Sequence, residues 1–353
     1  MAKIRVGIVG CGGIAMGAHT PAYLLEKRVE VAGVCDIIPE RVQKAQKRFF
    51  HSAKVYTDYK EMLKDESLDY IDICTPNYLH SIIAVDALNA GKHVLCEKPD
   101  AVSVEEALKM NEAAKKNGKT LMVIRNNRYL GPSQELKSII EKGTFGEIYC
   151  GRCGWVRRRG IPGKGGWFTT KAQSGGGPLI DLGVHMIDLA IWLMGNPTPV
   201  SVSGGTFTKF ADCDSSDSAN SDFGDKVEGG TFDVEDLAMG LIRFDNSAVL
   251  QIEFSWASNI RKEHRFVELR GTEAGCTWKN GVAEIYYEKD GKQKNKKLSK
   301  KHSIAGHNRN ISHFVDVLEG KAQPIFVPEQ GIDMIKILCA MYESAKTGKE
   351  VLL

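Results

Sequence analysis

The sequence predicts an α/β chain of two domains: a doubly wound parallel sheet over residues 1–125, then an α+β domain over residues 126–353 with a large, mostly antiparallel open sheet. Three observations predict this. Apolar runs alternate with helix-length stretches in the first 125 residues, a glycine-rich turn follows the first run, and strand-like alternation dominates the second part. A chain of 353 residues also exceeds the size at which one hydrophobic core keeps growing.

Five strands are expected in the first domain. They cover residues 4–9, 29–35, 70–74, 93–96 and 120–124. Helix-length segments separate them, such as 77–90, which begins after Pro76 and ends before Gly91. Strands separated in this way form a parallel sheet with right-handed crossovers.

The second domain is expected to begin with a strong helix over 177–194 and to continue with strands between residues 200 and 287. Asp245-Asn246 indicates a hairpin turn between two of these strands. Two late helices, about 308–319 and 329–346, close the chain.

Two segments are expected to lie on the surface. Residues 211–230 are rich in Ser, Asp and Gly, which predicts a mobile loop that a partner subunit would order. Residues 291–301 carry six lysines, which predicts a solvated hairpin face, with anion binding as the alternative.

The composition excludes several classes of protein. With 42% hydrophobic and 26% charged residues and no apolar run near the roughly 18 residues of a membrane span, the chain is expected to be soluble and not membrane-bound. The N-terminus enters a strand at once, which argues against a signal peptide. Nine cysteines, several inside apolar runs, fit reduced thiols in a cytoplasm. A net charge of +3 is too small to indicate nucleic acid.

A dinucleotide site is predicted at the first turn. Gly10-Cys11-Gly12-Gly13-Ile14-Ala15 lies between a predicted strand and a predicted helix. Gly10 permits the tight turn, Gly12 lets backbone amides approach a pyrophosphate, and the small Ala15 permits close packing of helix and strand. The helix N-terminus then faces the phosphate charge.

Asp36 ends the second strand, about 25 residues beyond Gly10, where a carboxylate accepts hydrogen bonds from ribose hydroxyls. A carboxylate also repels a 2′-phosphate, and no basic residue follows before Arg41. The expected cofactor is therefore NAD rather than NADP. The alternative is that Asp36 only caps a strand.

Two further strand ends carry polar residues: Thr75, Asn77 and His80 after one, Glu97 and Lys98 after the other. Ligands bind beyond the carboxyl ends of the strands in such a sheet, so these residues are expected at its crevice. The alternative for Glu97 is a surface ion pair.

The helix over 177–194 carries a second concentration of polar groups. Asp181 and His185 lie four residues apart and Asp188 three further on, so all three are expected to form one polar stripe on an apolar helix. Buried polar groups must pair or face a site, and the glycine-rich lead-in at 175–177 favours a site.

A sugar is the expected substrate. Residues 150–169 offer Trp155 and Trp167, whose rings suit the apolar faces of sugars, and Arg158, which suits hydroxyls or carboxylates. Cys150 and Cys153 form a single Cys-x-x-Cys pair, which is weak for metal or redox work, and no metal is expected.

The glycine-rich turn, Glu97-Lys98-Pro99 and residues 175–189 together resemble the Gfo/Idh/MocA family, the glucose–fructose oxidoreductase and inositol dehydrogenase relatives, over nearly the whole chain. The resemblance implies a Rossmann domain and a second domain whose open sheet packs subunits into a homo-oligomer. Carried over by position, Lys98 and His185 match the catalytic pair and Asp181 the aspartate beside them. Arg128 matches an arginine near the nicotinamide.

The sites that the sequence predicts fall into three sets. The catalytic set is Lys98, Asp181 and His185. The cofactor set is Gly10, Gly12, Gly13, Ile14, Asp36, Thr75, Asn77, His80, Glu97, Lys98, Arg128 and Trp167. The substrate set is Lys98, Arg128, Trp155, Arg158, Asp181 and His185.

Three functions remain open at this point. The first is an NAD-dependent dehydrogenase that oxidises a secondary hydroxyl of a sugar or glycoside, the 3-hydroxyl as in some family members, and inositol dehydrogenase is a variant of it. The second is a redox-neutral glycosidase that oxidises, eliminates and reduces within one cycle. The third is a cofactor-binding protein without chemistry, against which the intact Lys98, Asp181 and His185 argue.

Overall fold

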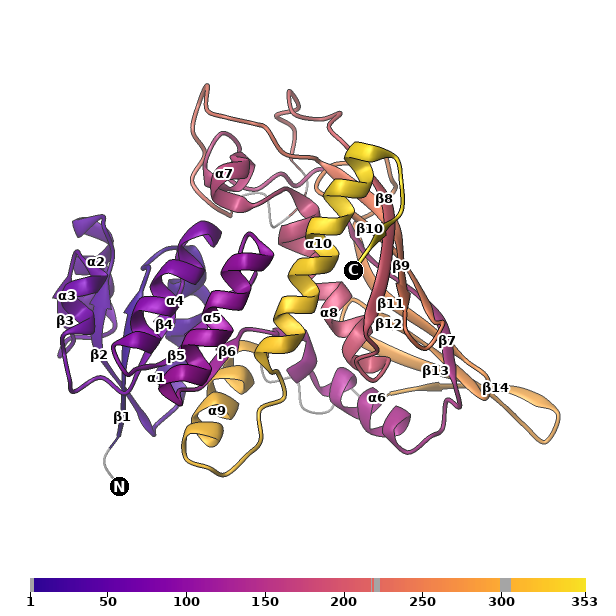
Figure 1. Cartoon of the computed structure of the whole chain (residues 1–353), viewed down its shortest axis with the longest axis horizontal. Coiled ribbons are helices and arrows are strands. Elements are labelled where there is room, and N and C mark those ends of the chain that lie inside the picture. Colours follow the sequence, from indigo (N-terminus) through magenta and orange to yellow (C-terminus); the bar gives the residue numbers. More distant parts are fainter. Residues whose placement is uncertain (1–2, 217, 219–222, 299–305) are drawn as a thin grey trace. The chain divides into compact units, whose positions relative to one another are not determined.

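A computed structural model of the chain describes residues 3–216, 218, 223–298 and 306–353 (Figure 1). The chain forms two compact units: Met1–Asn126 with Ala305–Ile332, and Asn127–Ile304 with Asp333–Leu353. The sequence assigned residues 305–332 to the second domain, whereas the structure groups them with the first. The two units are described in turn.

The first unit contains a six-stranded parallel sheet. Its strands are β1 (Ile4–Val9), β2 (Val29–Cys35), β3 (Lys54–Tyr56), β4 (Tyr70–Ile73), β5 (His93–Cys96) and β6 (Leu121–Val123). The strand order is β3-β2-β1-β4-β5-β6. The chain therefore adds strands on one side of β1 as far as β3 and then on its other side from β4 to β6. This is the doubly wound arrangement that the sequence predicted, and ligands bind where the order reverses.

Helices of the first unit follow the strands. They are α1 (Thr20–Leu25), α2 (Pro39–Arg48), α3 (Tyr59–Leu63), α4 (His80–Asn89), α5 (Val104–Asn117) and α9 (Gly306–Leu318), with the short turns η1 (Ala15–His19) and η2 (Asn77–Leu79). Helix α5 shows how local sequence sets a boundary: the Ser103 side chain accepts a hydrogen bond from the Glu106 amide, and Gly118 ends the helix with a left-handed φ of 59°.

Helix α9 explains why residues from far along the chain belong to the first unit. Ile311, Phe314 and Val315 are fully buried in the hydrophobic core of this unit. The Phe314 ring lies 5.1 Å from that of Tyr70, edge to face. Burial of three large side chains on one helical face fixes α9 to the sheet.

The second unit contains a nine-stranded sheet in the order β14-β13-β12-β11-β7-β10-β9-β8-β15. Its strands are β7 (Ile148–Val156), β8 (Pro199–Phe207), β9 (Leu237–Phe244), β10 (Val249–Ser255), β11 (His264–Gly271), β12 (Ala274–Lys279), β13 (Val282–Lys289), β14 (Lys292–Lys297) and β15 (Val351–Leu352). Neighbouring strands are antiparallel except β7 and β10. The sequence predicted this open, mostly antiparallel sheet and the β9–β10 hairpin.

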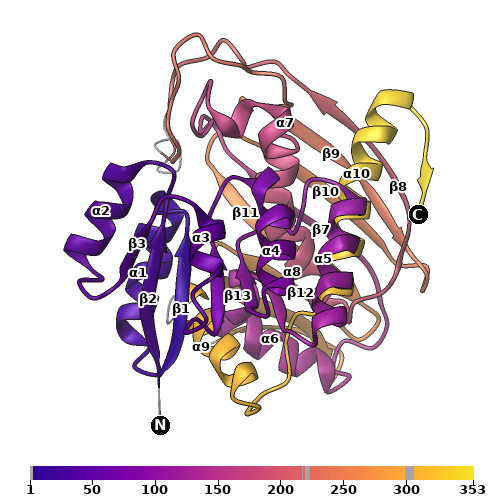
Figure 2. The same ribbon diagram turned by 60° about the vertical axis from the view of Figure 1, so that its left-hand side comes forward.

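Helices lie against one face of this sheet, as Figure 2 shows for α8 (Val184–Leu193) and α6 (Gly131–Glu141). The other helical elements are η3 (Asn126–Tyr129), η4 (Trp167–Thr169), α7 (Lys171–Ser174), η5 (Leu179–Gly183) and α10 (Pro328–Thr347). The stretch Lys171–Leu193 has the length and apolar composition of a membrane span, but 83% of its most apolar window is buried inside the protein. It is therefore a core element.

The predicted helix over 177–194 is two elements rather than one. The first part, η5, is a π-helical turn, and α8 continues from it. A π-helical turn places hydrogen bonds between residues five apart, so side chains before and after it no longer follow the spacing of an α-helix.

The two predicted surface segments are described in part. Residues 217, 219–222 and 299–305 lie outside the described residues, which leaves part of the 211–230 loop and the end of the lysine-rich segment without a structural account. Strand β14 is exposed along its whole length, as a solvated hairpin face requires. All nine cysteines are free thiols.

Candidate active site

The glycine-rich turn between β1 and η1 is built to admit a ligand. Gly10 has a φ of 96°, and a Cβ on it would lie 2.5 Å from the carbonyl oxygen of Cys74, so no other residue fits. A Cβ on Gly12 would meet no atom within 4 Å. The backbone is therefore tightly folded at Gly10 and open at Gly12, which is the shape a pyrophosphate needs.

Asp36 is held in place by backbone amides. Its Oδ2 accepts a hydrogen bond from Cys11 N at 2.8 Å and its Oδ1 accepts one from Ile38 N at 2.9 Å. A carboxylate offers about four acceptor positions. Two remain for ribose hydroxyls, so the residues present fit an NAD adenosine.

The loop after β4 supplies a second observation that fits a cofactor. The hydroxyl oxygen of Thr75 is buried and has no hydrogen-bond partner among the described residues. Asn77 is also buried. A buried hydroxyl without a partner is uncommon and fits a polar group of a bound molecule.

His80 has a structural role that the sequence did not indicate. Its Nδ1 lies 2.7 Å from the Pro99 carbonyl oxygen and its Nε2 lies 2.9 Å from the Thr75 carbonyl oxygen. The ring thus braces the loop after β4 against the loop after β5. Burial lowers the pKa of His80.

Glu97 is buried rather than part of a surface ion pair, since only 4% of it is exposed. Its Oε2 accepts a hydrogen bond from the backbone amide of Lys98 at 3.1 Å. The side chain of Lys98 is half-buried. A second carboxylate, Asp100, forms a buried ion pair with Arg125 in the same loop region.

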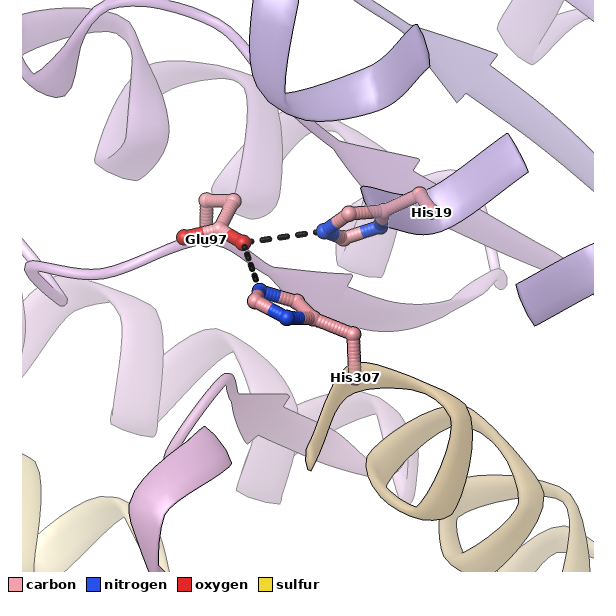
Figure 3. Close-up of side chains that lie close together, drawn as sticks. All are labelled: His19, Glu97 and His307. Atoms are coloured by element: carbon pink, nitrogen blue, oxygen red, sulfur yellow. Dashed lines mark hydrogen bonds and ion pairs between the residues drawn. The ribbon is translucent and has the colours of Figure 1, made fainter. Parts of the chain in front are cut away.

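Two histidines on Glu97 were missed by the sequence analysis. His19 from η1 and His307 from α9 both point their Nε2 atoms at Glu97 Oε1, at 2.9 Å and 3.4 Å (Figure 3). Neither histidine belongs to a local sequence motif with Glu97, because the fold brings the three residues together from distant parts of the chain.

Asp181 and His185 stand out in the second unit. Between Gly176 and Ala190 every residue is buried except these two, which are half-buried. Trp256 donates a hydrogen bond from Nε1 to Asp181 Oδ2 at 3.0 Å, and the ring of His185 lies 6.1 Å from that of Trp155. The otherwise apolar helix therefore presents one carboxylate and one imidazole.

Asp188 is buried, whereas Asp181 and His185 are half-buried. Its two carboxylate oxygens accept hydrogen bonds from Arg128 Nε at 2.8 Å and from a terminal Arg128 nitrogen at 2.6 Å. Both side chains are buried. The predicted stripe is therefore not uniform, because Asp188 forms a buried ion pair with Arg128, and the contact of Arg128 with the nicotinamide that the resemblance implies stays a prediction.

Trp155 lies at the edge of a cavity of about 320 Å³ lined by Trp155, Glu263, Arg265 and Asn280. Its Nε1 donates to Glu263 Oε1 at 2.9 Å, and the guanidinium groups of Arg157 and Arg265 each lie 5.1 Å from its ring centroid. Burial lowers the pKa of Arg265, as it does for Arg157.

The remaining predicted residues lie elsewhere in the second unit. Arg158 lines a separate cavity of about 530 Å³ with Arg159, Ser215, Ser216, Asn259 and Ile260. The ring of Trp167 stacks on that of Phe168 at 3.8 Å. Trp155 therefore lies next to a predicted catalytic residue, His185, whereas Trp167 lies against Phe168.

The strand order of the first unit, its open glycine turn and the anchored Asp36 together define a dinucleotide-binding unit. Residues 4–125 match the family model described as "Oxidoreductase family, NAD-binding Rossmann fold", and residues 133–277 match the GFO/IDH/MocA C-terminal domain. The chain belongs to the Gfo/Idh/MocA family and is an NAD-binding oxidoreductase.

Curated relatives cover most of the chain. It is 34% identical to D-glucoside 3-dehydrogenase of Escherichia coli (strain K12) over 99% of this chain and 97% of the relative. It is 31% identical to levoglucosan dehydrogenase of Pseudarthrobacter phenanthrenivorans over 79% of this chain and 74% of the relative. A solved complex of levoglucosan dehydrogenase with NADH and levoglucosan has a TM-score of 0.84 at 25% identity, covering 99% of each chain.

Proposed function

We propose that this protein is an NAD-dependent dehydrogenase that oxidises a secondary hydroxyl of a glycoside, at the 3-position of the sugar ring. The observation that carries the chemistry is the pair Asp181 and His185, the two half-buried polar residues on a helix that is otherwise buried from Gly176 to Ala190. The choice of a glycoside is supported by the relatives named for glucoside and levoglucosan oxidation.

Oxidation of a carbinol needs a group that takes the hydroxyl proton and a group that stabilises the developing charge on oxygen. When bound, NAD accepts the hydride. We assign proton transfer to His185, because an imidazole side chain can both take up and release a proton. We assign polarisation of the substrate hydroxyl to Lys98 and an orienting role to Asp181.

Trp256 fixes the orientation of Asp181. Its indole N–H donates to one carboxylate oxygen of Asp181, which holds the carboxylate plane. Because the indole ring of Trp256 is fully buried, the anchor is rigid. This arrangement suits a group that must hold a neighbour at a fixed angle.

Trp155 and Arg158 are assigned to the sugar. This assignment is supported by the position of Trp155 beside His185 and by the cavities that Trp155 and Arg158 each border. Thr75, Asn77 and Asp36 are assigned to NAD. The geometry favours a structural role for His80 and Arg128.

Cytoplasmic location and self-association are part of the proposal. Nine free thiols suit a reducing compartment. Along the sheet of the second unit, large apolar side chains are exposed: Tyr149, Phe207, Met239 and Leu241. Such a surface suits burial against a second copy of the chain.

The test is formation of NADH, followed by absorbance, with NAD and a panel of alkyl glucosides, anhydrosugars, free sugars and inositols. The proposal expects turnover with glucosides and a product whose carbonyl carbon is C3 by NMR. Turnover with inositols alone would show that the substrate is a cyclitol and not a glycoside. Release of the aglycone without net NADH would make the enzyme a redox-neutral glycosidase.

A further inference from the structure

We propose that His19 and His307 are positioning residues for Lys98, which act through Glu97 by clamping its carboxylate so that the backbone around the lysine is held in one orientation. The proposal rests on the role of Lys98 in the proposed function. Three elements of the first unit, η1, the end of β5 and the start of α9, bring the three side chains together (Figure 3).

The carboxylate of Glu97 is held on both of its oxygens. Glu97 Oε1 lies 2.9 Å from His19 Nε2 and 3.4 Å from His307 Nε2. Oε2 accepts the backbone N–H of Lys98 at 3.1 Å. Since the carboxylate is planar, fixing Oε1 also fixes the direction in which Oε2 meets the amide of Lys98.

The backbone is held on the far side of Lys98 as well. The carbonyl oxygen of the next residue, Pro99, lies 2.7 Å from His80 Nδ1. The chain is thus anchored at the amide of Lys98 and at the carbonyl that follows it. A flexible lysine stem gains precision when its Cα is fixed, because fewer torsions remain to place the ammonium.

His19 is itself immobilised. Its Nδ1 lies 2.7 Å from Asp72 Oδ2, and Tyr23 donates its hydroxyl hydrogen to the same oxygen at 2.8 Å. His19 and Asp72 are completely buried. One chain of contacts therefore runs from Tyr23 through Asp72, His19 and Glu97 to the amide of Lys98.

The charges suit this arrangement. Burial by itself would raise the pKa of Glu97, but its contacts with His19 and His307 hold that pKa well below the usual range. Glu97 is therefore ionised and acts only as an acceptor. An ionised carboxylate accepts stronger hydrogen bonds than a neutral acceptor does.

His307 is the side chain on which the proposal is best tested. It is 18% exposed, whereas His19 is completely buried, so its replacement disturbs the core least. In His307→Leu the donor is lost. In His307→Gln an amide N–H replaces the Nε2 donor at a similar distance from the backbone. Asn308→Leu on the same helix is the matched control.

The experiment measures turnover and lysine reactivity in the same purified proteins. We expect His307→Leu to lower kcat on the order of tenfold while KM and the NAD dissociation constant stay within about threefold. His307→Gln is expected to recover kcat to within about twofold of wild type, and Asn308→Leu to match wild type. Limited acetylation followed by mass spectrometry is expected to show altered labelling of Lys98, but not of other lysines, in His307→Leu alone.

Three outcomes would overturn the proposal: unchanged kcat and unchanged Lys98 labelling in His307→Leu, equal loss in His307→Leu and His307→Gln, or a stoichiometric transition metal that the wild type holds and His307→Leu loses. The last would make His19, Glu97 and His307 metal ligands. Failure of the proposed function is separate: a wild type with no sugar turnover, but with Lys98 labelling that depends on His307, would leave the clamp standing.

Discussion

Asp36 in the first unit and Asp181 in the second are held in different ways. The backbone amides of Cys11 and Ile38 hold Asp36, and Cys11 belongs to the glycine-rich turn. The indole side chain of Trp256, 75 residues along the chain, holds Asp181. Backbone anchors come with a short motif, whereas side-chain anchors depend on tertiary structure. Substitutions around Asp36 should therefore act locally, whereas the position of Asp181 should also depend on its distant partner Trp256.

The largest effect is expected from Lys98→Ala. Loss of the group that polarises the hydroxyl should lower kcat/KM on the order of a thousandfold, within the range for removal of an acid–base partner. NAD affinity should change little, because Asp36 and the glycine turn are untouched. Steady-state kinetics and NAD titration measure the two quantities, and near-normal turnover would remove Lys98 from the mechanism.

Arg128→Leu should act on stability instead of catalysis. It leaves Asp188 buried without its bidentate partner, and loss of one member of a buried ion pair costs about 3 kcal/mol or more. Urea unfolding measures this. The double variant Arg128→Met with Asp188→Leu should recover much of the loss, whereas weakened NAD binding in a stable double variant would restore the cofactor role for Arg128.

Asp181→Asn should lower kcat about a hundredfold, because an amide cannot orient and stabilise a protonated partner as a carboxylate does. Trp256→Phe, which removes only the indole donor to Asp181, should lower kcat by a factor of about five, which corresponds to about 1 kcal/mol for one hydrogen bond. If Trp256→Phe were as damaging as Asp181→Asn, the tryptophan would have a role beyond holding the carboxylate.

An effect of about the same size as that of Trp256→Phe is expected from pH on the stability of the first unit. Burial alone would lower the pKa of His19, but Asp72 and the neighbouring Cys74 hold it well above its usual value. The unfolded chain loses this proton near pH 6.5 and the folded chain keeps it, so the contribution is complete below that pH and declines above it. The free energy of unfolding should fall by up to about 1.4 kcal/mol between pH 7 and 8.

Asp72→Asn tests this slope directly, because it removes the carboxylate that keeps His19 charged. The variant should be less stable than wild type at pH 7, and its free energy of unfolding should be nearly independent of pH between pH 7 and 8. An equal slope in wild type and Asp72→Asn would show that another group titrates.

The sequence predicted most of the fold because its signals are local. Strands β1, β2, β4 and β5 are apolar runs between turn residues, and their bounds agree to within a residue. Strand β3 was missed because Lys54–Tyr56 is three residues long and largely exposed at the sheet edge. The segment 305–332 was expected in the second domain, because nothing in the linear sequence shows that α9 packs into the hydrophobic core of the first unit.

The candidate site divides along the same line. Gly10, Asp36 and Lys98 belong to motifs whose spacing is fixed by adjacent strand ends. His307 was missed because it reaches Glu97 from far along the sequence, and the pairing of Asp188 with Arg128 was missed because the two residues lie 60 positions apart. The sequence could predict that a polar or charged side chain at these positions is functional or buried, but it could not predict which side chain it pairs with.

The central claim is that hydride leaves C3 of a glycoside for NAD. An alkyl glucoside deuterated at C3 tests it in a single turnover, with the reduced cofactor analysed by mass spectrometry. The account predicts that deuterium appears in the cofactor and that the rate falls when transfer limits turnover. Reduced cofactor without deuterium, or deuterium retained in the sugar, would contradict it.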